Sequence, residues 1–160
     1  RPTAAMRAIA VRGLVPEVYE WLAHDADRRE IVEFLSMEGG PDGGFDDLVA
    51  ACQIGLDGTP KLELAQNYWD EMGNGSLARV HTELHRKLSR ALGLSCPPRD
   101  RQPVEALERS VLTGLLATNR WLQPEFLGAL GLLELQAGPR CRKVVAALER
   151  IGAGADALDF

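Results

Sequence analysis

The sequence predicts an all-α fold, and three observations lead to that class. Apolar residues recur at helical spacing along almost the whole chain, no segment shows the sustained alternation of a half-buried strand, and most glycines and prolines lie between the helical segments. The predicted helices cover 17–22, 28–38, 45–54, 60–72, 76–92, 104–117, 124–137 and 139–151. A chain of 160 residues has the length of one ordinary domain, so we expect a single helical domain over residues 1–160.

Residues typical of helix ends support these boundaries. Asp27 stands directly before the second predicted helix, where its side chain can cap the first turn. Ser76 is the expected N-cap of the fifth helix, and Gly93 follows the last residue of that helix. A polar, proline-rich link at 95–103 then separates the first five helices from the last three.

The net charge argues against two classes of partner. The chain has 18 basic and 23 acidic residues, which gives a formal net charge of −5. Nucleic acids and anionic membranes are bound through basic patches, so we expect neither as a partner. No apolar run approaches the roughly 18–20 residues that span a bilayer, and residues 1–12 contain no long apolar signal segment.

The cysteines indicate a reducing compartment. Cys52, Cys96 and Cys141 are odd in number and widely spaced, and no two of them form a Cys-x-x-Cys pair. This pattern fits neither a disulfide framework nor a cysteine zinc site. We therefore expect reduced thiols and a cytoplasmic protein.

Four polar residues stand in otherwise apolar helical segments: Glu38, Glu71, His81 and Glu134. Burying an ionised carboxylate without a partner is costly, and a metal ion is the strongest partner available. Helical bundles build two-metal sites from carboxylates and imidazoles that project inward from separate helices. This ligand chemistry suits iron(II) or manganese(II), whereas the lack of paired cysteines disfavours zinc. Asp70 can support a neighbouring ligand by a hydrogen bond.

The spacing of these residues does not by itself require a metal site. Ten residues separate Glu71 from His81, which on a straight helix places the two side chains roughly 80° apart. The Gly-Asn-Gly break at 73–75 can correct that angle, because glycine permits a kink or a reset of the helix. His85 can pair with His81 as His-x-x-x-His, although the basic residues after His85 favour an exposed face. Taken singly, a glutamate after an apolar run is most often solvated, and a single histidine is most often hydrogen-bonded and not a ligand.

Several short motifs contain these residues in a fixed order. They are Phe-Leu-x-x-Glu ending at Glu38, Asp-Glu-Met-Gly-x-Gly around Glu71, Val-His-x-Glu-Leu around His81, Ala-Leu-Gly-Leu at 91–94, and Gly-Leu-Leu-Glu ending at Glu134. In this order and context the motifs resemble the iron-containing redox enzyme family, the haem-oxygenase-like diiron oxidases and oxygenases. The resemblance covers roughly residues 31–160, and the Asp-Glu-x-Gly-x-Gly element with its following histidine is the most specific part.

The resemblance implies a fold, a cofactor and a set of ligands. The implied fold is a haem-oxygenase-like helical bundle, and Glu38, Glu71, His81 and Glu134 correspond to iron ligands, with Glu33 as the alternative to Glu38. The family's last ligand helix carries His-x-x-x-Asp-x-x-His and follows an aromatic residue such as Phe160. We therefore expect that helix to be truncated or disordered beyond residue 160.

The resemblance also implies an activity and partners. We expect two iron ions (Fe2+/Fe3+) and O2 as co-substrate, in an oxidase or oxygenase that acts on a small, amino-acid-derived metabolite of a biosynthetic pathway. Such chemistry needs an external electron donor, and a homodimer is a reasonable expectation for this fold class.

Four alternative functions are compatible with the predicted architecture. A haem-oxygenase-like helical protein without a diiron site can be a cofactorless oxidase, a thiaminase-type hydrolase or a haem protein. The hydrolase needs a nucleophilic cysteine, for which Cys52 is the candidate, and a haem protein needs an axial histidine, for which His24 is the candidate. A non-catalytic helical interaction module is also compatible, but it leaves the order of the motifs unexplained.

Overall fold

Every regular element is helical in the part of the chain that this computed structural model describes, residues 4, 8, 15–39 and 45–159. The α-helices are α2 (Val18–His24), α3 (Arg28–Gly39), α4 (Phe45–Cys52), α5 (Gly58–Glu71), α6 (His81–Leu92), α7 (Val104–Thr118), α8 (Gln123–Arg150) and α9 (Ala155–Leu158). Short 3-10 turns join them at Gly73–Gly75, Leu77–Arg79, Arg99–Arg101 and Arg120–Leu122. The all-α prediction is confirmed.

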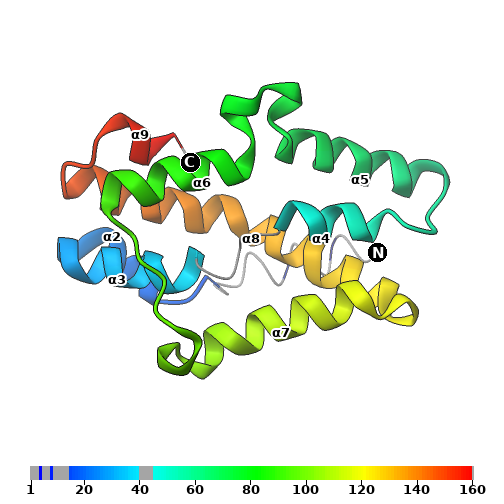
Figure 1. Cartoon of the computed structure of the whole chain (residues 1–160), viewed down its shortest axis with the longest axis horizontal. Coiled ribbons are helices and arrows are strands. Elements are labelled where there is room, and N and C mark those ends of the chain that lie inside the picture. Colours follow the sequence, from blue (N-terminus) through cyan, green and yellow to red (C-terminus); the bar gives the residue numbers. More distant parts are fainter. Residues whose placement is uncertain (1–3, 5–7, 9–14, 40–44, 160) are drawn as a thin grey trace.

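The long helix α8 organises the bundle. It runs across the middle of the molecule, with α6 and α9 along one side and α7 along the other in the view of Figure 1. Helix α8 contacts α2, α4, α7 and α9, so elements from both halves of the sequence meet on it. Helix α6 packs on α3 and α9, while α4 packs on α5 and α7.

The buried apolar side chains form two clusters. The larger joins α2, α3, α6, α8 and α9 through Tyr19, Leu22, Ala26, Ile31, Leu35, Leu88, Leu92, Ala147, Leu148 and Ala157. The smaller joins α4 to the first half of α8 through Val49, Cys52, Phe126 and Leu130. Burial of these side chains supplies most of the driving force that holds the helices together.

Local sequence explains where two of these helices begin and end. At the start of α3, the Asp27 carboxylate accepts a hydrogen bond from the Glu30 amide at 2.9 Å, and the Glu30 carboxylate accepts one from the Asp27 amide at 2.8 Å. This reciprocal pair is a capping box. Helix α6 ends at Gly93, whose φ of 69° is left-handed, as its predicted position after the last helical residue requires.

Two predicted boundaries are wrong. Helix α6 begins at His81 and not at Ser76, because residues 77–79 form a separate 3-10 turn before it. Helix α8 is continuous where two helices were predicted, and Pro139 lies inside it. A proline inside a helix removes one backbone hydrogen bond, which packing on the neighbouring helices of α8 compensates.

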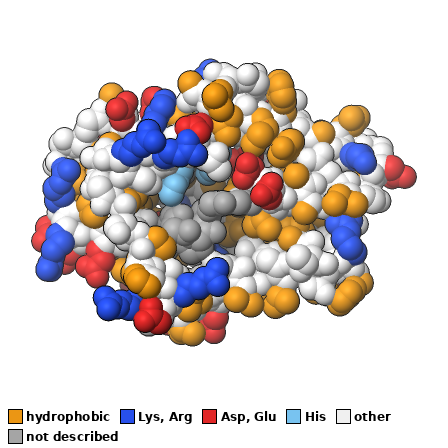
Figure 2. All heavy atoms as spheres, viewed as in Figure 1, with side chains coloured by type: hydrophobic (Ala, Val, Ile, Leu, Met, Phe, Trp, Pro, Cys, Tyr) orange, Lys and Arg blue, Asp and Glu red, His pale blue; other side chains and the backbone are white. Residues whose placement is uncertain are grey.

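Some large apolar side chains remain exposed. On α5 and the turn after it these are Leu62, Trp69 and Leu77, and Figure 2 shows apolar side chains gathered on that side of the molecule. None of the helices in the described ranges is both long enough and apolar enough to cross a membrane.

Candidate metal centre

A pocket of about 270 Å³ lies between the two apolar clusters, and all four predicted ligands line it. Glu38 comes from the last turn of α3, Glu71 ends α5, His81 begins α6, and Glu134 lies in the middle of α8. Leucine, valine and alanine side chains of α6, α8 and α9 form much of the remaining wall. Four side chains far apart in the sequence therefore face one mostly apolar cavity.

The turn between α5 and α6 brings Glu71 and His81 together. Glu71 Oε2 lies 3.4 Å from His81 Nδ1. Two 3-10 turns lie between them, and this tight connection requires glycine at position 73, where φ is 61°. A Cβ atom there would lie 2.5 Å from the carbonyl carbon of Arg79 and 2.7 Å from the nitrogen of Val80. The predicted correction of the angle between the two side chains thus takes the form of a break between two helices, made by these 3-10 turns.

The Glu71 carboxyl group lies in a place that disfavours its charge. Its side chain is 14% exposed. Desolvation, together with the negative charges of Glu134, Asp46 and Asp70, raises the pKa of Glu71 to about 7. A positive ion between Glu71 and Glu134 would relieve both effects.

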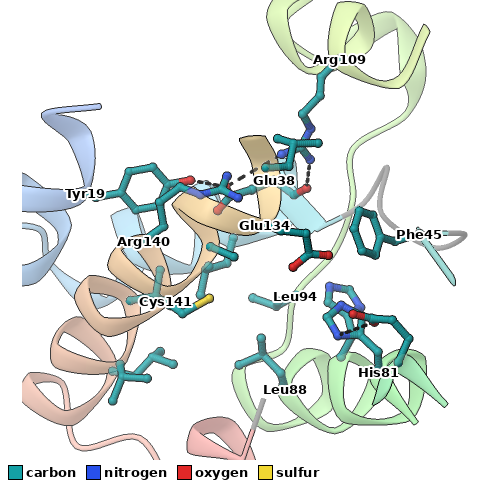
Figure 3. Close-up of a pocket in the computed structure, with 18 of the residues that line it drawn as sticks. Tyr19, Glu38, Phe45, His81, Leu88, Leu94, Arg109, Glu134, Arg140 and Cys141 are labelled. Carbon is teal, nitrogen blue, oxygen red and sulfur yellow. Dashed lines mark hydrogen bonds and ion pairs between the residues drawn. The ribbon is translucent and has the colours of Figure 1, made fainter. Parts of the chain in front are cut away.

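Glu134 shows the same need for a cation. Its Oε1 atom is buried and has no hydrogen-bond partner among the residues that the structure describes. In Figure 3 the carboxylate of Glu134 turns toward Phe45 and His81, on the side of the pocket away from Arg140. A buried carboxylate oxygen without a donor is costly unless a ligand or ion supplies the missing interaction.

His85 also lines this end of the pocket, and its Nε2 atom is buried. The expectation that His85 lies on an exposed face is therefore wrong. His81, His85, Leu88 and Leu92 follow one another at steps of four, three and four residues, which places them on the inward face of α6. This helical spacing predicts the inward direction of His85 better than the basic residues next to it do.

Glu38 lies at the opposite end of the pocket, bound to cations of the protein itself. Arg109 Nη1 and Arg140 Nη1 are 3.9 and 3.8 Å from Glu38 Oε1, and the Tyr19 hydroxyl donates a hydrogen bond to the same oxygen. Figure 3 shows Tyr19 and Arg140 on one side of Glu38 and Arg109 on the other. Glu33, the alternative first ligand, is exposed and does not line the pocket.

The donor types fit iron, although the side chains are not gathered around one point. Within the described residues, no group of three or more His, Cys, Asp or Glu side chains lies close enough to hold a metal ion. Glu71, His81, Glu134 and His85 nevertheless supply carboxylate oxygen and imidazole nitrogen, the ligands that iron(II) accepts. The unpartnered Glu134 oxygen and the disfavoured charge of Glu71 fit a site that takes up a cation.

The structure also bears on Asp70, Cys52 and His24. Asp70 is exposed and accepts a hydrogen bond from Gln66 at 3.1 Å, so the predicted supporting bond to a ligand is not seen among the described contacts. Cys52 is fully buried, and desolvation raises the pKa of its thiol to about 11, which disfavours a nucleophilic role. His24 is exposed beside Glu20 and does not line the pocket, so it does not support a haem site there.

A helical bundle with carboxylates and imidazoles along one internal pocket has the architecture on which helical metalloproteins build their sites. A comparison with protein-family models agrees, because the model of the iron-containing redox enzymes matches residues 32–160. Since this match covers most of the chain, the protein belongs to the iron-containing redox enzyme family and has its haem-oxygenase-like helical fold. Comparisons with curated proteins and with solved structures found no match.

Arg109 and Arg140 are charged pocket residues that the sequence analysis did not assign to the site. The sequence predicts that one helix ends before Pro139 and that another begins there. The helical spacing that places Arg140 beside Glu134 on α8 therefore could not be followed across Pro139. On the continuous helix, Glu134, Ala137, Cys141 and Val144 recur at helical spacing along the pocket wall, and Arg140 lies beside this row. Arg109 gave no comparable signal, because α7 has no fully buried residue that would mark its inward face.

Proposed function

We propose that the protein is a non-haem diiron oxidase or oxygenase that activates O2 in this pocket and acts on a small organic metabolite. The observation that carries the proposal is the convergence of Glu71, His81 and Glu134 in one apolar cavity of a chain that belongs to the iron-containing redox enzyme family. The contact between Glu71 and His81 joins two of the proposed ligands without any metal.

Each side chain has a distinct part in this proposal. Glu71, His81 and Glu134 hold iron, and His85 is placed to add a second imidazole from the same face of α6. Iron held by carboxylates and imidazoles supplies the electrons that reduce O2, and an external donor restores them. The apolar walls exclude bulk water, which strengthens the attraction between the carboxylates and a cation.

Glu38 is the fourth proposed ligand. In the structure, its Oε1 atom accepts a hydrogen bond from Tyr19 and lies 3.9 and 3.8 Å from Nη1 of Arg109 and Arg140. We propose that Glu38 completes the set of ligands when iron is bound.

Anaerobic iron(II) loading of the full-length protein tests this function. We expect about two iron ions per chain after desalting, and consumption of O2 when the loaded protein is exposed to air and a reductant. Glu71→Ala and His81→Ala should each abolish iron uptake and O2 consumption, because each removes a central ligand. Metal analysis and an oxygen electrode provide the two measurements.

The chain offers matched controls for both substitutions. Glu33→Ala removes an exposed glutamate and His24→Ala an exposed histidine, and neither residue lines the pocket. Both control variants should load iron as the unchanged protein does. Unchanged iron uptake in Glu71→Ala and His81→Ala would refute the ligand assignment, and uptake of a single iron would refute the two-ion site.

A further inference from the structure

Helix α7 carries large apolar side chains on a face that stays exposed. Its inner face contributes Ser110 and Thr113 to the pocket and packs on the smaller apolar cluster through Leu116 and Ala117. The large apolar side chains of its outer face, and of the turn after it, are 52–77% exposed; they are Val104, Val111, Leu112, Leu115 and Trp121. Figure 2 shows apolar side chains along the lower edge of the molecule, where α7 lies in Figure 1. A partner surface that covered them would remove apolar area from water.

The spacing of these residues is typical of a surface on which two helices pair. Positions 104, 108, 111, 115 and 118 follow one another at steps of four, three, four and three residues, and all of them are exposed. Such steps place the side chains in one narrow stripe, through which two α-helices pack side by side. Val104, Val111 and Leu115 lie in the stripe, and Leu112 lies beside it. The stripe therefore fits another α-helix.

The exposed area approaches what one side of a stable dimer buries. Together the five side chains expose roughly 600 Å², the upper limit for the largest apolar patch on a typical monomer. A standard interface buries about 800 Å² on each partner and has polar side chains at its rim. Glu105, Glu108 and Thr118 are exposed in and beside the stripe, where they can supply such a rim. The outer face of α7 thus offers most of an interface by itself.

The charges along α7 favour a second copy of this helix in the antiparallel direction. Glu105 and Glu108 are exposed in its first half, and Arg120 is exposed just after its end. The Arg120 guanidinium donates hydrogen bonds to the carbonyls of Ala51 and Ile54, which do not neutralise its charge. In an antiparallel pair, the acidic half of each helix faces the basic end of the other. A parallel pair would instead bring the two acidic halves together.

We propose that the outer face of α7 is the interface of a homodimer, in which α7 packs antiparallel on α7 of a second copy about a two-fold axis near Leu112. One patch then serves on both chains, as two-fold symmetry requires. The proposal is independent of the proposed function, because this face lies opposite the side of α7 that lines the pocket.

The exposed apolar side chains of α5 are less suited to this role. The ring of Trp69 already packs on its own turn, where its atoms lie 3.1 and 3.2 Å from the Cβ position of Gly75. Leu62 stands between the exposed, charged side chains of Lys61 and Glu63. Helix α5 therefore provides a control surface for the experiment.

Sedimentation velocity of the metal-free protein, over a wide range of micromolar concentrations, tests the proposal. We expect a species with twice the mass of one chain. Leu112→Glu and Leu115→Glu should each weaken dimerisation at least tenfold, because each places a carboxylate in the apolar centre of the interface. Leu62→Glu is the matched control and should leave the dimer intact. All three leucines are exposed, so circular dichroism should show the same helix content in every variant.

Disulfide cross-linking tests the antiparallel direction. The background protein has serine in place of Cys96 and Cys141, the two exposed thiols. In that background, Leu112→Cys should form a disulfide with its own copy on oxidation, because it lies near the two-fold axis. Val104→Cys should not, since the first turns of two antiparallel helices lie at opposite ends of the pair.

Four results would overturn the proposal. One is the mass of a single chain for the unchanged protein at every concentration. Another is a dimer that persists in both Leu112→Glu and Leu115→Glu. A dimer that dissociates only in Leu62→Glu would assign the interface to α5. Disulfide formation through Val104→Cys and not through Leu112→Cys would show a parallel pair.

Discussion

At the scale of single residues, the pocket separates its charges into two ends. Glu71 and Glu134 lie with His81 at one end, and Glu38 lies with the arginines at the other. Both groups of acids face the same cavity, yet their surroundings differ. Glu38 has protein cations beside it, whereas burial and nearby acids raise the pKa of Glu71 to about 7, so that its carboxyl group readily takes up a proton near neutral pH.

Stability of the metal-free protein should therefore depend on pH through Glu71. The pKa of Glu71 rises from 4.5 to about 7 on folding, so between these values the folded state keeps a proton that the unfolded state has lost. The free energy of unfolding should fall as pH rises through this window and then level off, by roughly 3 kcal/mol in total. Glu71→Gln should remove this part of the pH dependence.

Urea denaturation at pH 5 and pH 8, with a chelator present, measures this effect. The difference in unfolding free energy between Glu71→Gln and the unchanged protein should grow in favour of the variant as pH rises. Glu33→Gln, which alters an exposed glutamate, serves as the control and should follow the unchanged protein. If the unfolding free energies of Glu71→Gln and the unchanged protein change equally between the two pH values, the pKa of Glu71 is not raised by folding.

At the scale of elements, the connection between α5 and α6 determines whether Glu71 and His81 meet. The 3-10 turn Leu77–Arg79 replaces the first part of the helix that the sequence predicted, and α6 begins at His81 itself. Gly73 is buried in the turn, with the backbone of Arg79 where a side chain would be. The small residue at this position therefore allows the tight connection that brings Glu71 and His81 together.

Gly73→Ala should damage both stability and iron uptake. The alanine would have to adopt a left-handed conformation and would also collide with the backbone of Arg79. We expect a loss of about 3 kcal/mol, since steric overlap adds to the conformational strain. Chemical denaturation and iron(II) uptake are the measurements.

Gly58→Ala is the matched control for that substitution. Gly58 has nearly the same φ, 57°, but nothing lies within 4 Å of the position of its Cβ. Its replacement should cost only about 1 kcal/mol and leave iron uptake intact. Equal losses of unfolding free energy in the two variants would show that the close approach of Gly73 to Arg79 does not add to the cost of the alanine.

At the scale of the whole molecule, Arg150 links the C-terminal end of α8 to the C-terminal end of α2 by hydrogen bonds. Arg150, the last residue of α8, donates from Nε to the carbonyl of Ala23 and from Nη2 to that of Leu22, both at 3.0 Å. It also donates to the carbonyl of Ala26. These bonds cap the end of α2 with a cation, as helix ends favour, and they fix α2 against the helix that carries Glu134.

Arg150→Met should weaken this connection while keeping most of the apolar stem. Three carbonyl groups would lose their donor, and we expect the free energy of unfolding to fall by about 2 kcal/mol. Arg142→Met, at an exposed position of the same helix, should change it by less than about 0.5 kcal/mol. Thermal denaturation of the metal-free protein measures both, and similar losses would contradict the capping role of Arg150.

The sequence by itself determined the helical class, the family and the residues that face the pocket at Glu71, His81 and Glu134. Apolar periodicity, helix caps and short motifs are local properties, and a single chain displays them directly. The tertiary structure alone decided that Pro139 lies within a continuous helix, that His85 faces inward, and that Glu38 meets Arg109 and Arg140. Those outcomes depend on how helices distant in the sequence pack on one another, and no local spacing encodes the contact between α3, α7 and α8.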